Sequence, residues 1–272
     1  MFSSSDYKSD KVHLYEAPEK KIFYSDILGG LKNVGIKKGD ILLVHSDILA
    51  FGRPHYSDIN IFFSVLIDAF IETIGPAGTL IMPTFSFSFT NGDDFYVSDS
   101  PSLVGALTNH FRKIKGVIRT HDPIHSCAIK GPKSKLLSEI SNDTFGDKSI
   151  YGHLLDHNAK IATFGTKFAD NCFFHFIEQK VQVPYRYIKI FNGNIIVGDK
   201  IKKLSFQYFV RDLDNKIESD VSQFNNDLLN DNYLRKQNLG MSSIFCIESK
   251  SFFDEGVKTL KKDINYFLKK SN

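Results

Sequence analysis

Apolar and polar positions along the chain follow two different periods, which predict helices and strands in alternation. Residues 57–74 place apolar side chains at three- and four-residue steps, and this spacing predicts an amphipathic helix. Residues 41–44 and 79–84 are short apolar runs bounded by turn residues, which is the pattern of buried strands. A second helical pattern, over residues 254–270, predicts an amphipathic helix that closes the fold.

Shorter signals fill the chain between and after these elements. Asn192-Gly193 is a hairpin turn signal, so residues 186–210 predict two paired strands around it. The Phe-rich residues 85–95 are interpreted as a loop that leaves the sheet, and the polar residues 211–240 as a helix with exposed loops. Ser25, Pro101 and Ser149 are predicted to begin further helices, and strands are predicted at 116–119, 127–131 and 160–165.

Strands that alternate with helices are typical of an α/β fold. We expect a three-layer sandwich with a central mixed sheet, mostly parallel, plus an antiparallel hairpin added late in the chain. No linker, internal repeat or low-complexity segment divides the sequence, so residues 1–272 are expected to form a single domain.

Composition and charge narrow the class of protein. The chain has 34 basic and 31 acidic residues and a net charge of +3, which is too mild for a nucleic-acid-binding protein. The first residues carry no signal-peptide core and no apolar run reaches the length of a bilayer, so we expect a cytoplasmic protein that has no membrane partner. Three scattered cysteines predict neither a disulfide framework nor a zinc ribbon.

A histidine and a glutamate three residues apart, His175 and Glu178, are candidates for acid–base chemistry. In a helix this spacing puts both side chains on one face. Asp170 and Asn171 are suitable N-cap residues for that helix, whose first backbone N–H groups have no partner within the helix. Acyl transfer needs at least a proton acceptor and a site that stabilises the oxyanion, and this segment could supply both. Such pairs are also common as solvated surface neighbours, so the spacing alone does not establish a site.

Polar residues gather at the carboxyl ends of the predicted strands, where α/β sheets bind ligands. His45 and Ser46 follow the first strand, and Thr84 follows the second. Residues 121–126 lie between two short strands, and residues 170–178 follow the last strand of the parallel set. Each of these residues is a common cap or turn residue when taken singly. Four such clusters at equivalent positions predict a shared site.

Two other chemistries are open alternatives. Cys172 lies one turn before His175, so a Cys–His nucleophile competes with the interpretation of Cys172 as a small buried apolar residue. Asp122, His175 and Glu178 together offer metal ligands, but no segment has metal-ligand spacing, and we expect no metal. The sequence contains no Gly-rich phosphate loop of the Walker or Rossmann type.

Taken in order, these segments resemble the aminoglycoside 3-N-acetyltransferase family over about residues 22–265. Cys172 occupies a position where the family usually has threonine, and Asp122-Pro123 replaces a common His-Pro. The resemblance rests on the joint pattern of Leu43-Val44-His45-Ser46-Asp47-Ile48 with Phe51-Gly52, residues 75–86, residues 100–108, residues 111–120, Asp122-Pro123-Ile124-His125-Ser126, Ser149-Ile150-Tyr151-Gly152 and residues 171–178.

The resemblance implies acyl-coenzyme A-dependent transfer to a primary amine, usually on an amino sugar, with acetyl-CoA as donor and without a metal. It places the active-site histidine on His175 and the acidic partner of that histidine on Glu178. It places the donor-binding segments on His45, Ser46, Met82, Pro83 and Thr84 and on the stretch that contains Arg119, Asp122 and Ser126.

We therefore expect His175 to take a proton from the substrate ammonium, while Glu178 or Asp170 orients the ring and stabilises the imidazolium. The amine then attacks the thioester directly, and backbone N–H groups near Asn171 and Cys172 stabilise the oxyanion. A covalent route through Cys172 is the alternative, and it predicts an acetyl-enzyme and ping-pong kinetics.

Three interpretations of the biological role follow. The mild positive charge favours a nucleotide-linked amino sugar of surface polysaccharide, because a polycationic ligand usually needs a surplus of carboxylates. The alternatives are an aminoglycoside antibiotic as acceptor, or a non-catalytic acyl-CoA- or sugar-binding protein that keeps the fold. A homodimer is compatible with the sequence.

Overall fold

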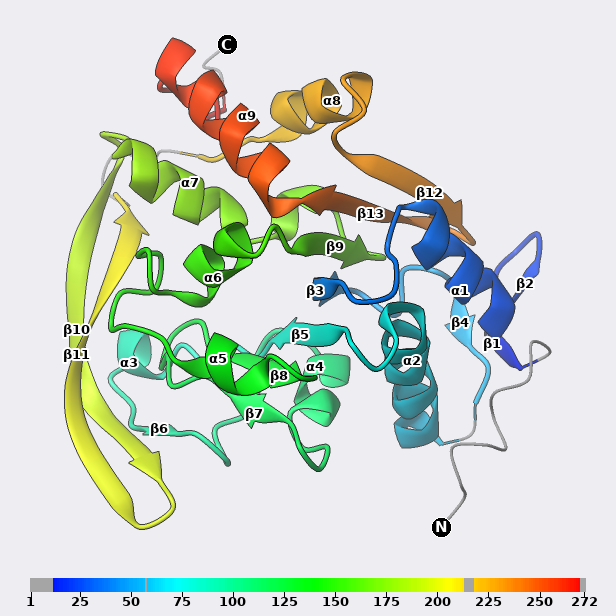
Figure 1. Ribbon diagram of the computed structural model, residues 1–272, viewed down its shortest axis with the longest axis horizontal. Coiled ribbons are helices and arrows are strands. Elements are labelled where there is room, and N and C mark those ends of the chain that lie inside the picture. The colour runs from blue at the N-terminus through cyan, green and yellow to red at the C-terminus, as the bar shows by residue number, and fades with distance from the viewer. Residues whose placement is uncertain (1–11, 57, 213–217, 270–272) are drawn as a thin grey trace.

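The structure, a computed structural model, describes residues 12–56, 58–212 and 218–269 (Figure 1). Positions 57, 213–217 and 270, which fall inside predicted elements, lie outside these residues. The middle layer is a seven-stranded sheet, which confirms the expected mixed sheet. Its strands are β3 (Ile41–Ser46), β5 (Thr79–Pro83), β7 (Ile118–Arg119), β8 (Cys127–Lys130), β9 (Lys160–Phe164), β12 (Arg235–Leu239) and β13 (Ser242–Glu248).

Parallel pairing is confined to the centre of this sheet, where β3 lies between β9 and β5. The strand order is β12-β13-β9-β3-β5-β8-β7, and all other pairs are antiparallel, so the expectation of a mostly parallel sheet was wrong. The edges are hairpins, and short connections can join only antiparallel neighbours. Periodicity missed β12 because this edge strand, Arg-Lys-Gln-Asn-Leu, is mostly polar and exposed.

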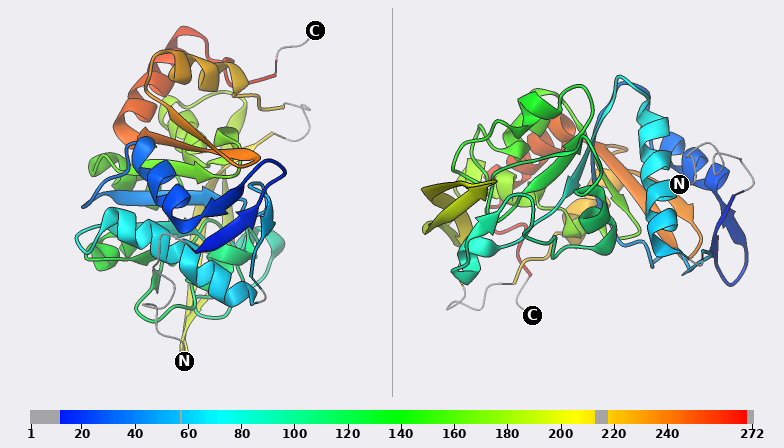
Figure 2. Two further views of the ribbon diagram at one scale, coloured as in Figure 1. Left: turned by 90° about the vertical axis from the view of Figure 1, so that its right-hand side faces the viewer. Right: turned by 90° about the horizontal axis from the view of Figure 1, so that it is seen from below.

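Helices cover both faces of the sheet, as the sandwich predicts (Figures 1 and 2). The cap predicted at Ser149 is present, because its side chain accepts a hydrogen bond from the Gly152 N–H. One face packs on α1 (Tyr24–Asn33), α2 (Ile59–Ile74) and α4 (Ala106–Phe111), and the other on α5 (Ser134–Ser138), α6 (Ile150–Asp156), α7 (Phe173–Val181), α8 (Ser222–Asn230) and α9 (Ser249–Lys262).

Several predicted helix ends are displaced. Helix α1 begins at Tyr24 rather than after a Ser25 cap, because Asp26 accepts a hydrogen bond from the Phe23 N–H at 2.8 Å. Helix α4 begins at Ala106 rather than at Pro101. Helix α9 starts at Ser249, directly after β13, and ends at Lys262. Within the described ranges, no helix has the length and apolar character that crossing a bilayer requires.

A long antiparallel hairpin flanks the sandwich, formed by β10 (Arg186–Val197) and β11 (Lys200–Arg211). Its turn lies at Gly198-Asp199, so the turn predicted at Asn192-Gly193 was wrong. Gly193 lies inside β10 for a packing reason, since a Cβ there would stand 2.5 Å from Cε1 of the Phe89 ring. The Phe-rich segment is a loop that contains α3 (Ser88–Asn91) and β6 (Phe95–Tyr96), and β6 pairs with β10.

A small sheet lies at the opposite end of the molecule from this hairpin (Figure 1). It consists of β1 (His13–Glu16), β2 (Lys21–Phe23) and β4 (Arg53–Pro54), in the order β2-β1-β4. The chain passes from the end of β3 through β4 into α2.

The contact between Gly193 and Phe89 predicts that Gly193→Ala destabilises the docking of the hairpin. An added methyl group forces the ring or the strand to shift, so the free energy of unfolding should fall by about 1–3 kcal/mol. Thermal unfolding measures this loss. Gly29→Ala is the matched control, because nothing lies within 4 Å of a Cβ at that helical position. An equal Tm for the two variants would contradict this account of Gly193.

Candidate active site

The central strands bring polar side chains to one end of the sheet. His45 lies directly opposite Thr163 in the parallel β3–β9 pair. Side chains alternate between the faces of a strand, so both lie on the face of Leu43 and Ile161, whose core includes residues of α6 and α7. The segment that follows β9 crosses this end of the sheet and carries His175.

The start of α7 depends on Asn171, although not in the way the sequence predicted. The Asn171 Oδ1 accepts a hydrogen bond from the Phe173 N–H at 3.1 Å, and the helix begins at Phe173. Asp170 instead ends a short 3-10 helix, Phe168–Asp170, and accepts a hydrogen bond from the Thr166 hydroxyl. Asp170 therefore does not cap α7.

His175 and Glu178 form the pair that their spacing predicted. The His175 Nδ1 lies 2.7 Å from the Glu178 Oε2, and the side chains are 28% and 2% exposed. The Arg186 Nε lies 2.8 Å from the same oxygen, as an ion pair. Glu178 is thus a buried carboxylate with two cationic or potentially cationic neighbours, whereas Asp170 does not contact the imidazole.

The charge state of Glu178 follows from these neighbours. Burial by itself raises the pKa of the carboxyl, but the hydrogen bond to His175 and the charges of His175 and Arg186 outweigh it and hold the pKa below its usual range. Glu178 is therefore ionised at neutral pH. Because Nδ1 faces this carboxylate, Nε2 is the ring nitrogen available to accept a proton from a substrate.

Cys172 is close to His175 in sequence but poorly suited to nucleophilic attack. Burial raises the pKa of the thiol to about 12, and the neighbouring Tyr151 hydroxyl and Arg186 lower it only in part. At neutral pH the thiol is therefore protonated, whereas the thiolate is the nucleophilic form. Direct transfer therefore accords with the structure better than a Cys172 intermediate.

The backbone amides expected to form an oxyanion site near Asn171 are partly occupied. The Asn171 N–H bonds to the Phe168 carbonyl oxygen at 3.3 Å, and the Phe173 N–H bonds to the Asn171 side chain. These two amides stabilise the turn itself and are not free for an oxyanion, so an oxyanion site at the amides near Asn171 and Cys172 stays a prediction.

Two buried polar atoms on the sheet below this segment are unsatisfied. The His45 Nε2 and the Thr163 Oγ1 meet no hydrogen-bonding partner among the described residues. Burial lowers the pKa of His45 to about 4, despite the opposing charge of Asp170, so the ring is neutral. Buried polar groups are normally paired, so these two atoms mark a place where a polar group of a ligand or a water molecule would bind.

Most of the other predicted donor-binding residues have structural roles. Met82 is fully buried in the core, Pro83 pairs with Cys127 in the sheet, and Thr84 is fully buried. Ser46 remains partly accessible at the end of β3, opposite Phe164. The sheet and the core enclose the side chains of Met82, Pro83 and Thr84, so donor binding by this segment stays a prediction that these side chains do not support.

Arg119 is a buried structural cation rather than a ligand-binding one. Its Nη1 donates to the carbonyl oxygens of Val97 and Ser100, at 3.1 and 2.6 Å. Its Nη2 donates to the Thr84 carbonyl oxygen at 2.6 Å, and its Nε to the hydroxyls of Thr84 and Ser126. Each nitrogen of the guanidinium donates to a protein acceptor, so the contacts indicate a structural role, and donor binding by Arg119 and Ser126 stays a prediction.

Asp122 also serves the local fold. Its Oδ1 accepts hydrogen bonds from the N–H groups of Ile124 and His125, both at 2.8 Å. Burial raises the pKa of Asp122 to about 6, against these hydrogen bonds. The carboxylate closes the turn between β7 and β8, a role typical of aspartate. Neither donor binding nor a metal site with His175 follows from this position.

Sequence reasoning assigned no role of its own to two side chains around the site, Arg186 and His125. Arg186 pairs with Glu178, and only its position just after the helix hinted at this. The buried His125 lies between two phenols, with its Nδ1 3.0 Å from the Tyr151 hydroxyl and its Nε2 3.1 Å from the Tyr208 hydroxyl. Burial holds the pKa of His125 well below its usual value, so this ring is neutral and positions both phenols.

A groove of 610 Å³ begins one turn along α7 from His175. Gln179 and Arg186 line the groove where it adjoins the His175–Glu178 pair. Asp143 and Asp147 also line it, and Asp147 is paired with Lys180. The groove therefore has two carboxylates near the candidate base, and Asp143 accepts hydrogen bonds from the side-chain amide of Gln179.

The comparisons with known proteins agree with this geometry. A family model for aminoglycoside 3-N-acetyltransferases matches residues 43–261. Aminoglycoside N(3)-acetyltransferase IV of Salmonella sp is 24% identical over 164 residues, which span 59% of this chain and 60% of the relative's length.

Solved structures share the fold. The apoenzyme of aminoglycoside acetyltransferase AAC(3)-IVa has a TM-score of 0.74 and 19% identity, with 96% of this chain and 94% of that chain covered. The binary complex of AAC-IIIb with CoASH has a TM-score of 0.73 and 17% identity, with 92% and 98% covered. Because the family model matches well over half of the residues, this chain belongs to the aminoglycoside 3-N-acetyltransferase family.

Proposed function

We propose that this chain transfers an acetyl group from acetyl-CoA to a primary amine of an aminoglycoside, with His175 as the general base. The observation that carries the proposal is the half-buried imidazole of His175 held 2.7 Å from the buried Glu178 carboxylate, beside a groove that contains carboxylates. Family membership supports the reaction class, and the relative complexed with CoASH supports the donor.

The reaction needs one proton acceptor and one acyl transfer. An alkyl ammonium is not nucleophilic until it loses a proton, which the Nε2 of His175 accepts. Glu178 stabilises the resulting imidazolium, and Arg186 keeps Glu178 ionised throughout. The amine nitrogen then forms a bond to the thioester carbon and the carbon–sulfur bond breaks. The proton that the nitrogen loses as it becomes an amide balances the departing CoA thiolate, which leaves as the free thiol.

The donor side of the proposal uses the unsatisfied atoms below α7. His45 and Thr163 offer one ring nitrogen and one hydroxyl, which suit the amide or carbonyl groups of an acyl-pantetheine arm. A hydrogen bond there would remove the cost of leaving both atoms buried and unpaired.

The acceptor proposal differs from the expectation of a nucleotide-linked sugar. Both the matching family and the Salmonella relative are named for aminoglycosides. Two carboxylates, Asp143 and Asp147, line the groove together with the cations Lys180 and Arg186, and we propose that the carboxylates contact ammonium groups of the ligand. The net charge of the whole chain did not reveal these local carboxylates.

The base assignment predicts that His175→Asn lowers kcat by ~10²–10⁴-fold, the usual contribution of a general base. Steady-state kinetics with acetyl-CoA and a reactive aminoglycoside measure the effect. His153→Asn is the control, since that ring, on α6, bonds to the Glu139 carbonyl oxygen and the substitution should leave kcat unchanged. Near-normal turnover by His175→Asn would refute the assignment.

The thiol assignment predicts that Cys172→Ala keeps kcat within a factor of about five, because no covalent intermediate forms on this residue. Mass spectrometry of the wild-type protein after incubation with acetyl-CoA alone should show no added acetyl group. An acetylated Cys172 peptide, together with ping-pong kinetics, would instead establish the covalent route.

The acceptor is tested by thiol release from acetyl-CoA with a panel of aminoglycosides and nucleotide-linked amino sugars. We expect release with aminoglycosides and none with the nucleotide-linked compounds. Asp143→Asn should raise the KM of the aminoglycoside more than it lowers kcat, since Asp143 is proposed to bind rather than react. Saturable acetyl-CoA binding without release for any amine would point to a non-catalytic binding protein and overturn the proposal.

A further inference from the structure

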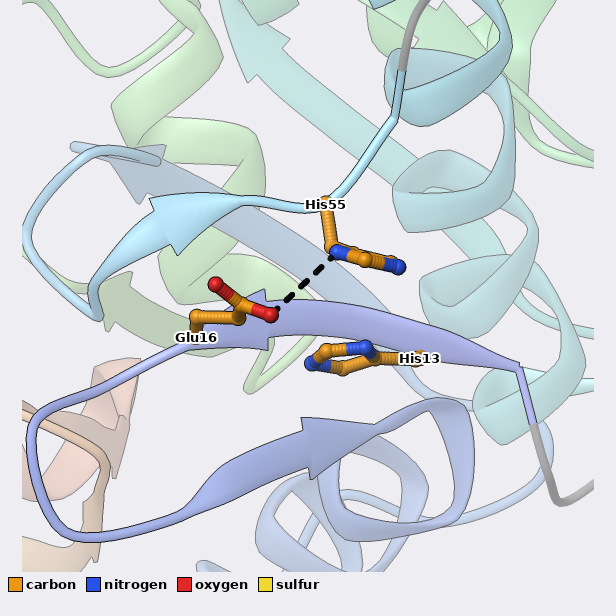
Figure 3. A group of neighbouring side chains, drawn as sticks. All are labelled: His13, Glu16 and His55. Carbon is orange, nitrogen blue, oxygen red and sulfur yellow. Dashed lines mark ion pairs between the residues drawn. The ribbon is translucent and has the colours of Figure 1, made fainter.

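A second cluster of chemically active side chains lies in the small sheet, outside the candidate active site. His13 and Glu16 belong to β1, and His55 follows β4 directly (Figure 3). One potential metal-ligand atom from each of the three residues lies within 4.8 Å of the others. The three side chains approach one another from two segments that are distant in sequence.

The three side chains lie close together but are only weakly bonded to one another. The His55 Nδ1 lies 3.6 Å from the Glu16 Oε1, which is too long for a good hydrogen bond, and these side chains are 52% and 48% exposed. The rings of His13 and His55 stack with centroids 3.9 Å apart. The His13 Nε2 lies 2.9 Å from the Tyr15 carbonyl oxygen, a contact to backbone of the kind that orients a metal-binding imidazole.

We propose that His13, Glu16 and His55 bind a Zn²⁺ ion that links β1 to the segment after β4. Two imidazoles and one carboxylate are a common protein ligand set for zinc, with water in the fourth position. Tetrahedral zinc with bonds of about 2.0–2.1 Å places its ligand atoms about 3.4 Å apart. Rotation of the exposed side chains, which separates the stacked rings, would achieve this contraction without movement of the strands.

The location indicates a structural role for the ion. Strand β4 has only two residues, and its pairing with β1 consists of two residue pairs plus the His55 N–H bond to the Leu14 carbonyl oxygen at 2.9 Å. So short a strand pair is weak by itself. A metal held from both sides would fix the path of the chain between β3 and α2, while α7 lies in another part of the molecule (Figure 1).

The charges around the cluster set the strength of binding. Glu16 lies opposite Lys21 in β2 and Arg53 in β4, so both cations compete with a metal ion for its carboxylate. Both imidazoles must be neutral to act as ligands, so binding should release protons and weaken as the pH falls from 7.5 to about 5.5.

The test uses full-length, tag-free protein that has been treated with a chelator and then dialysed. Isothermal titration with Zn²⁺ should show one saturable site, and a hundredfold excess over Kd should raise Tm by roughly 5–10 °C. Co²⁺ provides a second readout, because a tetrahedral site gives intense visible absorption bands. His13→Asn and His55→Asn should each weaken Zn²⁺ binding at least ~10-fold.

His153→Asn is the matched control, since it removes a histidine elsewhere on the surface and should leave the Zn²⁺ affinity unchanged. Loss of binding in the two cluster variants, with circular dichroism spectra like that of the wild type, supports the site. Equal zinc affinity in the wild type and the His13→Asn/His55→Asn double variant, or no saturable binding at all, overturns it. Acetyl transfer is measured separately, so either outcome leaves the proposed function untouched.

Discussion

The carboxylate of Glu178 is the constraint on which the candidate active site depends. It is 2% exposed, and an isolated charge at that depth would be too costly to keep. His175 and Arg186 approach it from α7 and from the start of β10, so the pairing connects the helix to the hairpin. The contacts that offset the cost of burying the Glu178 carboxylate also orient the His175 imidazole. The same contacts therefore contribute to the stability of the fold and to the chemistry of the site.

The polar residues at the strand ends divide into two kinds. Arg119 donates hydrogen bonds to the Ser126 hydroxyl and to a backbone carbonyl oxygen, and Asp122 accepts them from backbone N–H groups. All three side chains therefore have hydrogen-bonding partners within the protein. His45 and Thr163 are buried on the sheet face below α7 without such partners. The difference separates residues whose polar groups are paired within the fold from residues that carry buried, unpaired polar atoms.

The two ends of the molecule differ in how firmly their strands are held. At the hairpin end, the long β10–β11 pair packs aromatic side chains against the body, and Gly193 allows the Phe89 ring to come close. At the other end, β4 is held by few backbone contacts, and three ligand-type side chains gather beside it. Metal binding would add stability at the end of the fold where strand pairing contributes least.

The sequence by itself determined the local elements and the central pair. Apolar runs located β3, β5 and β9, helical spacing located α2, and the i, i+3 spacing placed His175 and Glu178 on one face of α7, because these signals act within a few residues. Only the tertiary structure decided that Arg186 forms an ion pair with Glu178 and that Arg119 donates hydrogen bonds to carbonyl groups. It also decided that β12 and β13 extend the sheet by antiparallel pairing. The hairpin turn lies at Gly198-Asp199 rather than at Asn192-Gly193, and the ring of Phe89, which is distant in sequence, packs on Gly193 within the strand. Contacts between residues far apart in the chain depend on how the layers meet, and no local pattern records them.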